Sequence, residues 1–463
     1  MARKRIQYAG EYILKEARLV CSSGVAFDLM GTILGIEIYE NIFSTSLSGN
    51  FMFVDENNII TNGPIIGQEY LYLKIGTPGL DEFDFDFTNV PFTTYKINTR
   101  EDATKNAQLI QVSFTSPEIV KNKRVRVSKS YTESIDKIVE SVLRDEKYIN
   151  TSKQLIIEPT SGIRKTISPN LHPYNFITNL ATEAISSKDN NPFFMFYESM
   201  RGINFRSLES MFEEDVVGDY AMGDFGENDR KKPDVKKELG RIMQFEIAAN
   251  SDMLTNIIAG MLGSSIIEHN IYNKSFSKST YSYIDDFDKF NRIHYNEKGF
   301  DNPIYSDSPL DDKNNTVGSF TEARIHLHSV NSGDTFDTQH TDAEALYKYQ
   351  PNKIKDSLLH RQAKFVELND GISIKMVING STTISVGQTI NVNIPVTGKV
   401  HEKVFDKFYT GKYLITKLKH SFDQITKKHE ITLFAAKDSF TESVPFGDNV
   451  PESTQKPTNE IYT

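Results

Sequence analysis

Several groups of residues in the chain could do chemistry, and the first is a run of acids. Its carboxylates are Asp81, Glu82, Asp84 and Asp86. Paired carboxylates can hydrolyse glycosidic bonds, and clustered ones can bind calcium. A calcium loop needs a turn, whereas these acids alternate with Phe83, Phe85 and Phe87 as they would on a strand. We therefore interpret the acids as the solvated face of a strand whose other face carries three rings.

A second group contains imidazoles. His326 and His328 would share one face of a strand, and His340 and Asp342 follow downstream. Imidazole and carboxylate side chains are typical zinc ligands. The segment is polar, however, and no HExxH motif or second cysteine supports a metal centre. We expect no bound metal here.

The third group is basic and consists of Lys121, Lys123, Arg124 and Arg126, followed by Lys129. A patch that binds nucleic acid usually has aromatic side chains between its basic ones, and this cluster has none. We expect either a solvated strand face or a rim that meets an acidic protein neighbour. These four leading residues are therefore candidate interface residues.

Other catalytic signatures are missing from the sequence. It has no Gly-x-Ser-x-Gly elbow, no phosphate-binding loop and no dinucleotide fingerprint, and Cys21 is its single cysteine. We therefore expect no enzymatic activity and no cofactor. The absence of catalytic motifs in so long a chain favours a structural or interaction protein.

Composition sets further limits. The chain has 463 residues, which is enough for about three or four domains. It has 52 Lys and Arg against 62 Asp and Glu, a net charge of -10, which argues against a dedicated nucleic-acid binder. No apolar run approaches the roughly 18–20 residues of a membrane helix, and no signal peptide follows Met1. We expect a protein without a membrane segment, made in a reducing compartment.

The spacing of apolar residues divides the chain into six predicted segments. Short alternating strands fill residues 1–125, and residues 126–237 mix helices with strands. Residues 238–284 begin a second set of strands, which continues in 343–440 after a leading helix. A long polar insertion, 285–342, interrupts this second set, and 441–463 form a C-terminal tail. Within the second set, Asn379-Gly380 predicts a tight hairpin.

The two sets of strands share a faint internal repeat. The dipeptide Gly67-Gln68 recurs as Gly387-Gln388, and both pairs precede a predicted strand. Ile110, Val112 and Phe114 have apolar counterparts at almost the same offset along the chain, at Ile431, Leu433 and Ala435. Chance similarity between alternating strands is one explanation. The other is two copies of one small β-barrel, which would let three chains place six similar units around one axis. Gln68 and Gln388 would then be equivalent interface positions.

The order of short motifs resembles the central baseplate hub protein of contractile-tailed bacteriophages. These motifs are residues 38–43 (IYENIF), 47–49 (LSG), 64–69 (PIIGQE), 114–118 (FTSPE), 124–125 (RV), 157–162 (IEPTSG), 194–197 (FMFY), 201–205 (RGINF), 412–415 (KYLI) and 437–439 (KDS). The resemblance covers most of residues 30–440 and is weakest over 213–345. It implies an α+β, mainly β fold with two similar small β-barrels in one chain, joined by a mixed α+β domain and carrying a long polar insertion.

The resemblance also implies a function. Such hubs are structural and form a trimeric ring that adapts the six-fold tail tube to the three-fold central spike. Implied partners are two further copies of the chain, the spike, the tail tube or tube-initiator proteins and the surrounding baseplate wedge proteins, with DNA only as passing cargo. The implied location is the tail baseplate of the virion, after assembly in the host cytoplasm.

Two alternatives share the sequence evidence. One is the hub of a bacterial contractile injection system, which has the same fold in another context. The other is a receptor- or carbohydrate-binding tail protein that uses exposed rings at Phe83, Phe85 and Phe87.

Overall fold

A computed structural model describes residues 6–56, 58–104, 106–222, 235–250, 252–270, 274–294, 302–307, 310, 314–329, 354–396 and 404–442. The chain forms two compact units. Unit 1 comprises Met1–Ala248, Thr338–Pro351 and Ser373–Lys437, and unit 2 comprises Ala249–Asp337, Asn352–Ile372 and Asp438–Thr463. No helix in the described ranges is long and apolar enough to cross a membrane.

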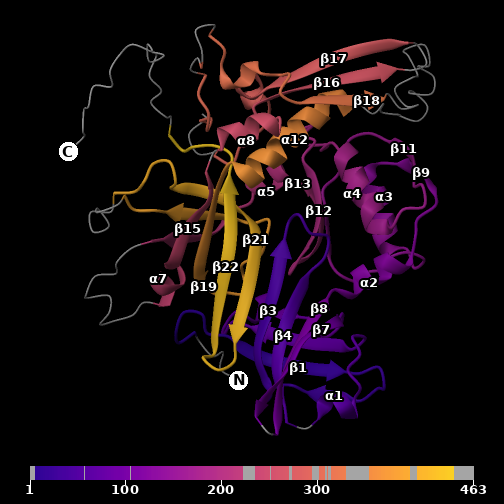
Figure 1. The fold of residues 1–463 in the computed structure, drawn as a ribbon, viewed down its shortest axis with the longest axis vertical. Coiled ribbons are helices and arrows are strands. Elements are labelled where there is room, and N and C mark those ends of the chain that lie inside the picture. The colour runs from indigo at the N-terminus through magenta and orange to yellow at the C-terminus, as the bar shows by residue number, and fades with distance from the viewer. Residues whose placement is uncertain are drawn as a thin grey trace. The chain divides into compact units, whose positions relative to one another are not determined.

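Unit 1 is built on one large sheet, seen in the lower part of Figure 1. The first set of strands is β1 (Ile13–Val20), β2 (Ala26–Asp28), β3 (Ile33–Asn41), β4 (Ser48–Asp55), β5 (Tyr70–Gly76), β6 (Phe85–Asp86), β7 (Phe92–Thr104) and β8 (Ala107–Thr115). A short helix, α1 (Ile59–Asn62), follows β4. Alternate side chains of these strands, among them Phe51, Phe53 and Phe114, are buried in one core. The alternation seen in the sequence therefore marks the face that packs.

The second set of strands continues the same sheet. It contains β15 (Ile242–Asn250), β19 (Ile372–Asn379), β20 (Thr389–Asn393), β21 (Gly411–Asp423) and β22 (Lys428–Lys437). Within the described ranges the sheet has 14 strands, with a main order of β15-β19-β22-β21-β3-β4-β8-β7-β5-β1-β2. A further strand, β14 (Val216–Ala221), pairs with β20, and helix α7 (Val235–Leu239) precedes β15. The predicted fold class, mainly β with α+β character, is confirmed.

The two sets are structural repeats of each other. The neighbours β3-β4-β8-β7-β5 match β15-β19-β22-β21-β20 pair by pair. Strands β7 and β21 each have 13 residues, and β3 and β15 each have nine. The β7–β8 hairpin has a bulge between Thr94 and Lys96, and the β21–β22 hairpin has one between Ile415 and Lys417, at the offset that also relates β8 to β22. A shared bulge at a shared position is a feature of common architecture rather than of chance alternation.

A mixed α+β region lies between the two sets. Its helices are α2 (Pro117–Arg124), α3 (Ile135–Arg144), α4 (Pro173–Glu183) and α5 (Leu208–Phe212). Its strands are β9 (Ser130–Glu133), β10 (Leu155–Ile157), β11 (Arg164–Ile167), β12 (Phe194–Ser199) and β13 (Gly202–Ser207). The apolar face of α3 packs with α4 and with β12 and β13 around one core. Strands β12 and β13 pair as an antiparallel hairpin, and Pro173 begins α4.

Unit 2 interrupts the second set of strands between β15 and β19. It contains α8 (Met253–Ile258), β16 (Gly263–Asn270), β17 (Ser275–Ser282), α9 (Tyr283–Asp286), β18 (Ile325–Ser329) and α12 (Ile354–Asp370). Two short 3-10 helices, Phe287–Lys289 and Val317–Ser319, complete it. The strands form a three-stranded sheet in the order β17-β16-β18. In the first repeat the same position, between β3 and β4, holds only residues 42–47.

Two predicted elements are wrong. Residues 81–87 do not form one strand, because Asp81–Phe83 make a 3-10 helical turn and only Phe85–Asp86 pair with β5. The hairpin predicted at Asn379-Gly380 is absent from the described residues. There β19 lies between β15 and β22, and the N–H of Gly380 donates to the carbonyl of His429. Long-range pairing with β22 replaces the local turn that the dipeptide favours.

Candidate functional site

The joint between the two repeats is a continuous pairing of β21 with β3. Seven consecutive antiparallel pairs run from Lys417↔Asn41 to Asp423↔Gly35 without a bulge. The N–H of Ile42 and the N–H of Gln424 extend the ladder at its two ends, at 3.0 and 2.9 Å from their acceptors. Main-chain bonds of this kind need no particular side chains, so an equivalent pair of strands could reproduce them.

One face of this joint is polar and half-buried. Glu37 accepts hydrogen bonds from Tyr39 at 2.5 Å and from Lys419, across the joint, at 3.0 Å. A further set of side chains, Asn50, Asn98 and Ser113, is linked by hydrogen bonds on β4, β7 and β8. The polar groups thus bind one another along the sheet instead of standing free.

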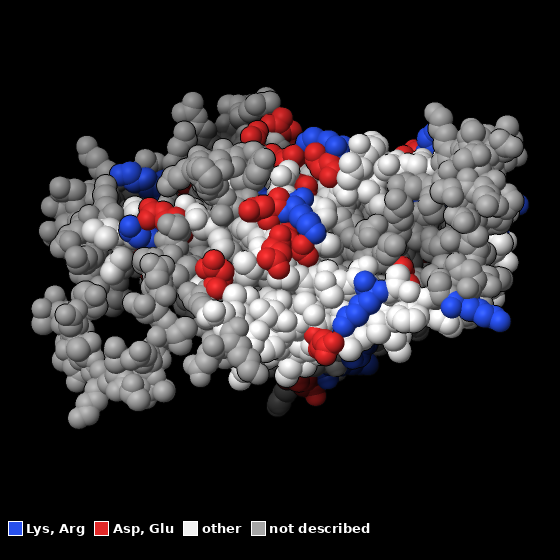
Figure 2. All heavy atoms as spheres, turned by 90° about the horizontal axis from the view of Figure 1, so that it is seen from above, with Lys and Arg blue, Asp and Glu red and all other residues white. Residues whose placement is uncertain are grey.

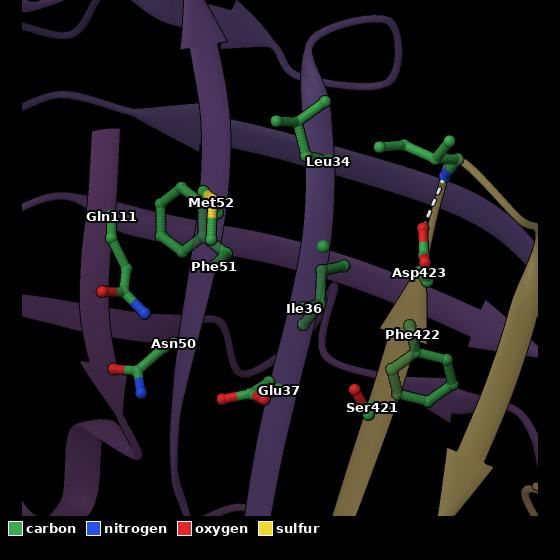
Figure 3. A pocket seen from close by; sticks show the side chains of 12 residues that line it. Leu34, Ile36, Glu37, Asn50, Phe51, Met52, Gln111, Ser421, Phe422 and Asp423 are labelled. Atoms are coloured by element: carbon green, nitrogen blue, oxygen red, sulfur yellow. Dashed lines mark hydrogen bonds between the residues drawn. The ribbon is translucent and has the colours of Figure 1, made fainter. Parts of the chain in front are cut away.

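A shallow hollow of about 360 Å³ lies over the joint on this face. Figure 3 shows side chains of β3, β4, β8 and β21 around it, with Asp423 accepting a hydrogen bond beside them. Its lining is Leu34, Gly35, Ile36, Glu37, Asn50, Phe51, Met52, Gln111, Ser421, Phe422, Asp423 and Ile425. The donors and acceptors here are amides, hydroxyls and carboxylates without a nucleophile and base in hydrogen-bond contact, so this lining has no catalytic arrangement that we recognise.

The other face of the joint buries a carboxylate. Glu40 is 2% exposed and accepts from the N–H of Met200 at 2.9 Å and from the hydroxyl of Ser385 at 2.6 Å. Its second oxygen lies 3.0 Å from Nε2 of His420 on β21. A buried carboxylate with three partners therefore ties β3 to the tip of the β12–β13 hairpin and to the second repeat.

A second buried carboxylate anchors the α+β region. Glu198 accepts from the N–H of Leu47 at 2.9 Å and from the hydroxyl of Ser116 at 2.8 Å. The ammonium of Lys153 bridges it, at 2.5 Å, to Glu118, at 2.8 Å. Burial, with the charge of Glu118, raises the pKa of Glu198 despite the lowering effect of Lys153. Both acids are at most 2% exposed, so the lysine neutralises charge that water cannot reach.

Strands β7 and β15 of the sheet both keep a free edge in the described residues. The pairing of β5 with β7 covers only Phe92 and Thr93, and the rest of β7 has β8 on one side alone. Strand β15 ends the main strand order at the other end. In the repeat, β7 is the counterpart of β21 and β15 is the counterpart of β3. The counterparts of these two strands thus form the joint, whereas β2, β6 and β14, which within the described ranges also have a neighbour on one side only, have no such counterparts in the joint.

The acidic run does not form an isolated face. Lys15 binds Asp81 at 2.7 Å and Asp84 at 2.6 Å, and Lys74 binds Asp86. Burial acts to raise the pKa of Asp86, but the hydrogen bond and charge of Lys74 together with the hydrogen bonds from Thr88 outweigh it and lower this pKa to about 2. Asp81, Glu82 and Asp86 are exposed, in agreement with the interpretation as solvated acids, but lysines of β1 and β5 pair with this run.

The rings beside these acids are also placed differently from the prediction. Phe85 is 5% exposed and Phe87 is 7% exposed, and both belong to the core of the first repeat. Phe83 alone, at 40%, reaches solvent. The face of three exposed rings that a carbohydrate-binding groove would need is therefore not formed.

The two histidines do share one face of strand β18. His326 and His328 are half-buried, while Ile325, Leu327 and Ser329 point the other way and are exposed. Burial, and next Arg324, lower the pKa of His326. No group of three potential ligands occurs in the described ranges. His340 and Asp342, the other residues of that prediction, lie outside those ranges.

The basic candidates lie on a helix and its exit. Lys121, Lys123 and Arg124 form the exposed last turn of α2, and the exposed Arg126 follows it. The predicted strand was wrong here, since Ser116 and Pro117 begin a helix. Lys121 donates to the carbonyl of Asn150, and Arg126 donates to that of Asn170.

The two glutamines share a place in the repeat but not an environment. Gly67 and Gly387 both have positive φ, +87° and +79°, ahead of β5 and β20. Gln68 is exposed, whereas Gln388 is 2% exposed and accepts from the N–H of Ser385 at 2.7 Å. A side chain buried in its own chain cannot contact a neighbour, so we withdraw Gln388 from the interface candidates and keep Gln68.

Sequence reasoning missed the buried Glu40, Glu198, Glu118 and Lys153. A signal existed for Glu40, because it follows Ile36 and Ile38 on the buried face of one strand. The partners of these groups are far away in the sequence, up to 380 residues for Glu40 and His420. Spacing within one segment does not reveal such contacts.

Comparisons with known proteins identify the fold. No family model matches the chain, and no curated protein does. Three similar solved structures are a tail protein from Neisseria meningitidis MC58, the 43 kDa tail protein of prophage MuSo2 from Shewanella oneidensis, and an Escherichia coli component of the type VI secretion system described as structurally similar to bacteriophage T4 tail proteins.

The first has a TM-score of 0.51 at 9% identity, over 92% of this chain and 97% of that one. The second has 0.49 at 10%, over 91% and 98%, and the third 0.43 at 10%, over 92% and 76%. Because the second and third scores lie below 0.5, the assignment rests on the first. The chain has the fold of a tail protein.

Proposed function

We propose that the protein is the structural hub of a contractile phage tail baseplate, a trimeric ring that adapts a six-fold tail tube to a three-fold central spike. The observation that carries the proposal is the joint between two equivalent sets of strands within one chain. A chain with two similar units presents six of them when three copies assemble. A ring of this kind can meet six-fold symmetry on one side and three-fold symmetry on the other.

The repeat indicates how such a ring would close. Strand β21 of the second repeat pairs with β3 of the first. The same pairing between neighbouring chains would join β7 of one copy to β15 of the next. Both strands keep a free edge in the described residues, and a free edge is a template for strand addition. Edge pairing would therefore continue one sheet around the ring.

The repeat also predicts the register of that contact. Lys419 pairs with Tyr39 on one side and with Thr432 on the other. Thr432 corresponds to Gln111 of β8, opposite which β7 has a second bulge at Asn98 and Thr99. The offset of the first bulges makes Asn98 the counterpart of Lys419. Strands β3 and β15 have equal lengths, and each has a glutamate at its fifth position, Glu37 and Glu246. This alignment makes Ala248 the counterpart of Tyr39. Asn98 of one chain would thus face Ala248 of the next.

The charge of the chain supports a channel through which DNA passes without being bound. The joint has a polar face whose groups are already hydrogen-bonded. On the separate face drawn in Figure 2, acidic side chains lie near the middle with basic ones beside them. The net charge is -10. Such surfaces repel a polyanion, which suits DNA as passing cargo rather than as a ligand.

The remaining parts of the proposal follow from the same role. The partners are the central spike, tail tube or tube-initiator proteins and baseplate wedge proteins, and the location is the virion tail baseplate after assembly in the host cytoplasm. Gln68 and the basic residues at the end of α2 (Lys121, Lys123, Arg124 and Arg126) are the side chains that we assign to protein contacts. The protein is a scaffold and not an enzyme. The hub of a bacterial injection system would have the same architecture in another context.

Cysteine cross-linking tests the ring and its register together. In the variant Asn98→Cys with Ala248→Cys, mild oxidation should give a ladder that ends at three chains on a non-reducing gel. The matched control combines Asn98→Cys with Gln244→Cys, which moves the partner by four residues, about 13 Å along the strand. A disulfide needs Cα atoms within about 7 Å, so the control should stay monomeric. No cross-links, equal cross-linking in the control, or a ladder that continues beyond three would contradict the proposal.

A further inference from the structure

A chain of buried hydrogen bonds crosses the joint on its core side. The hydroxyl of Ser385 donates to Glu40, whose other oxygen lies 3.0 Å from Nε2 of His420. Nδ1 of His420 lies 3.0 Å from Nε2 of His429 on β22. Both imidazoles are 0% exposed. The second repeat thus meets β3 through two titratable rings and one carboxylate that water does not reach.

When both rings are neutral, their hydrogens can be assigned in one way. The carboxylate of Glu40 accepts the hydrogen of Nε2 of His420, which leaves Nδ1 of that ring as an acceptor. Nε2 of His429 must then be the donor between the two rings. Nδ1 of His429 keeps only a lone pair. It is buried and has no hydrogen-bond partner in the structure.

An added proton always places a hydrogen on that same atom. If His429 takes the proton, its Nδ1 becomes an N–H. If His420 takes it, Nδ1 of His420 becomes a donor, and the hydrogen of His429 has to move from Nε2 to Nδ1. The new N–H then faces no acceptor, and a buried donor without a partner is costly.

The surroundings leave little room to relieve this cost. The ring of Phe422 stacks on His429 at 4.1 Å, and the ring of Tyr12 lies 6.5 Å away. A methyl group built on Gly380 would lie 2.3 Å from Nδ1, so backbone packs closely against it. The polar groups that face the two rings are Glu40 from β3, Tyr12 ahead of β1 and Ser385, which reaches the other oxygen of Glu40. Burial raises the pKa of the Tyr12 phenol, so this group stays neutral.

We propose that Glu40, His420 and His429 form a proton-sensitive latch, which holds β21 against β3 while both imidazoles are neutral and loosens this joint when the cluster takes up a proton. The latch lies within one chain, so it does not depend on ring formation or on the proposed function.

The direction of the pH dependence follows from linkage. Burial, and next His420, hold the pKa of His429 well below its usual value of 6.5. A base with a lowered pKa in the folded state binds fewer protons there than in the unfolded chain. Its contribution to stability is complete above pH 6.5 and is lost as the pH falls below that value. For one proton the limiting change is tenfold in the folding equilibrium constant per pH unit.

The test compares wild type with His429→Gln. The amide nitrogen of glutamine can donate to His420 as Nε2 does, but it does not titrate. Urea unfolding is followed by circular dichroism between pH 8 and pH 5, and hydrogen–deuterium exchange is measured over β3 and β21. In wild type the folding constant should fall below pH 6.5, by up to tenfold per unit, with faster exchange in β3 and β21. The variant should show a flatter profile in both measurements.

His172→Gln is the matched control, because Nδ1 of His172 binds the carbonyl of Val125 in a half-buried site far from the joint in sequence. It should keep the wild-type profile. The latch would be overturned if the folding constant of His429→Gln kept the wild-type dependence on pH, or if the control lost that dependence. If His429→Gln does not fold, an NMR titration of the wild-type histidines decides instead. The latch requires a His429 ring that stays neutral at pH 6, and a ring that titrates near 6.5 in the folded protein would refute it.

Discussion

Removal of the lysine between two buried glutamates should strongly destabilise unit 1. In Lys153→Met the aliphatic stem remains, but Glu118 and Glu198 lose the ammonium that lies 2.8 and 2.5 Å from them. The lysine side chain is 11% exposed and the acids are 2% and 1% exposed. Removing one partner of a buried ion pair costs about 3–5 kcal/mol. We expect a loss of this size at pH 8, or a fall of roughly 10 °C in the unfolding midpoint.

The loss should depend on pH in a defined direction. Burial already raises the pKa of Glu198, and without Lys153 this effect has no opposing cation. An acid with a raised pKa in the folded state is destabilising where it must ionise, and this penalty fades as the pH falls from that raised pKa towards the ordinary value of 4.5. The difference between wild type and Lys153→Met should therefore be largest at pH 8 and smaller at pH 5.

Chemical unfolding followed by circular dichroism at both pH values provides the assay. The control is Lys188→Met, which removes an equally close ion pair with Glu213 from a side chain that is 64% exposed. Its midpoint should match that of wild type. A loss below about 1 kcal/mol for Lys153→Met, or the same loss at pH 8 and pH 5, would refute this view of the buried acids.

Two more predictions concern single positions. Gly24→Ala and Gly387→Ala both place an alanine at positive φ, which costs about 1–2 kcal/mol. Only the methyl group at Gly387 would also meet the buried hydroxyl of Tyr197, at 2.2 Å. Thermal unfolding should thus show a further loss of about 1–3 kcal/mol for Gly387→Ala, and equal losses would contradict the close approach. In unit 2, burial acts to raise the pKa of Asp286, but hydrogen bonds from His360 and Lys289 lower it to about 2. Asp286→Asn should destabilise at pH 5, with a difference from wild type that shrinks as the pH falls from 3.8 towards 2. A difference that does not change with pH would contradict that assignment.

The spacing of apolar residues correctly predicted the strands and helices whose neighbours are close in the sequence or whose buried face is apolar throughout. The alternation of Ile110, Val112 and Phe114 marks the buried face of β8, and the same alternation marks β22. The helical spacing from Ile135 to Leu143 marks the buried face of α3. In these segments one face is apolar throughout, so the periodicity reports directly on burial.

The errors arose where distant segments decide the structure. The acids of residues 81–86 look like an exposed strand face until Lys15 and Lys74 are placed beside them. Asn379-Gly380 favours a hairpin by itself, but β19 pairs with β15 and β22, which are both far from it in the sequence.

Some features of the candidate site could likewise be predicted from the sequence, and others could not. The internal repeat was visible in the sequence, because the glycines ahead of β5 and β20 and the alternation of β8 and β22 keep their spacing. The joint of β21 with β3 was not visible, since main-chain pairing leaves no side-chain signature. The contacts of the buried Glu40 with its histidine partners were missed because these residues are far apart in the sequence. Glu40 and His420 are separated by 380 residues.

The native mass of the purified full chain, alone and co-expressed with a candidate spike protein, tests the central claim most directly. The ring predicts an assembly of three chains in at least one of the two conditions, with the spike bound in the second. The two conditions together identify what closes the ring. A monomer in both, or a stable dimer or tetramer in both, would contradict the account.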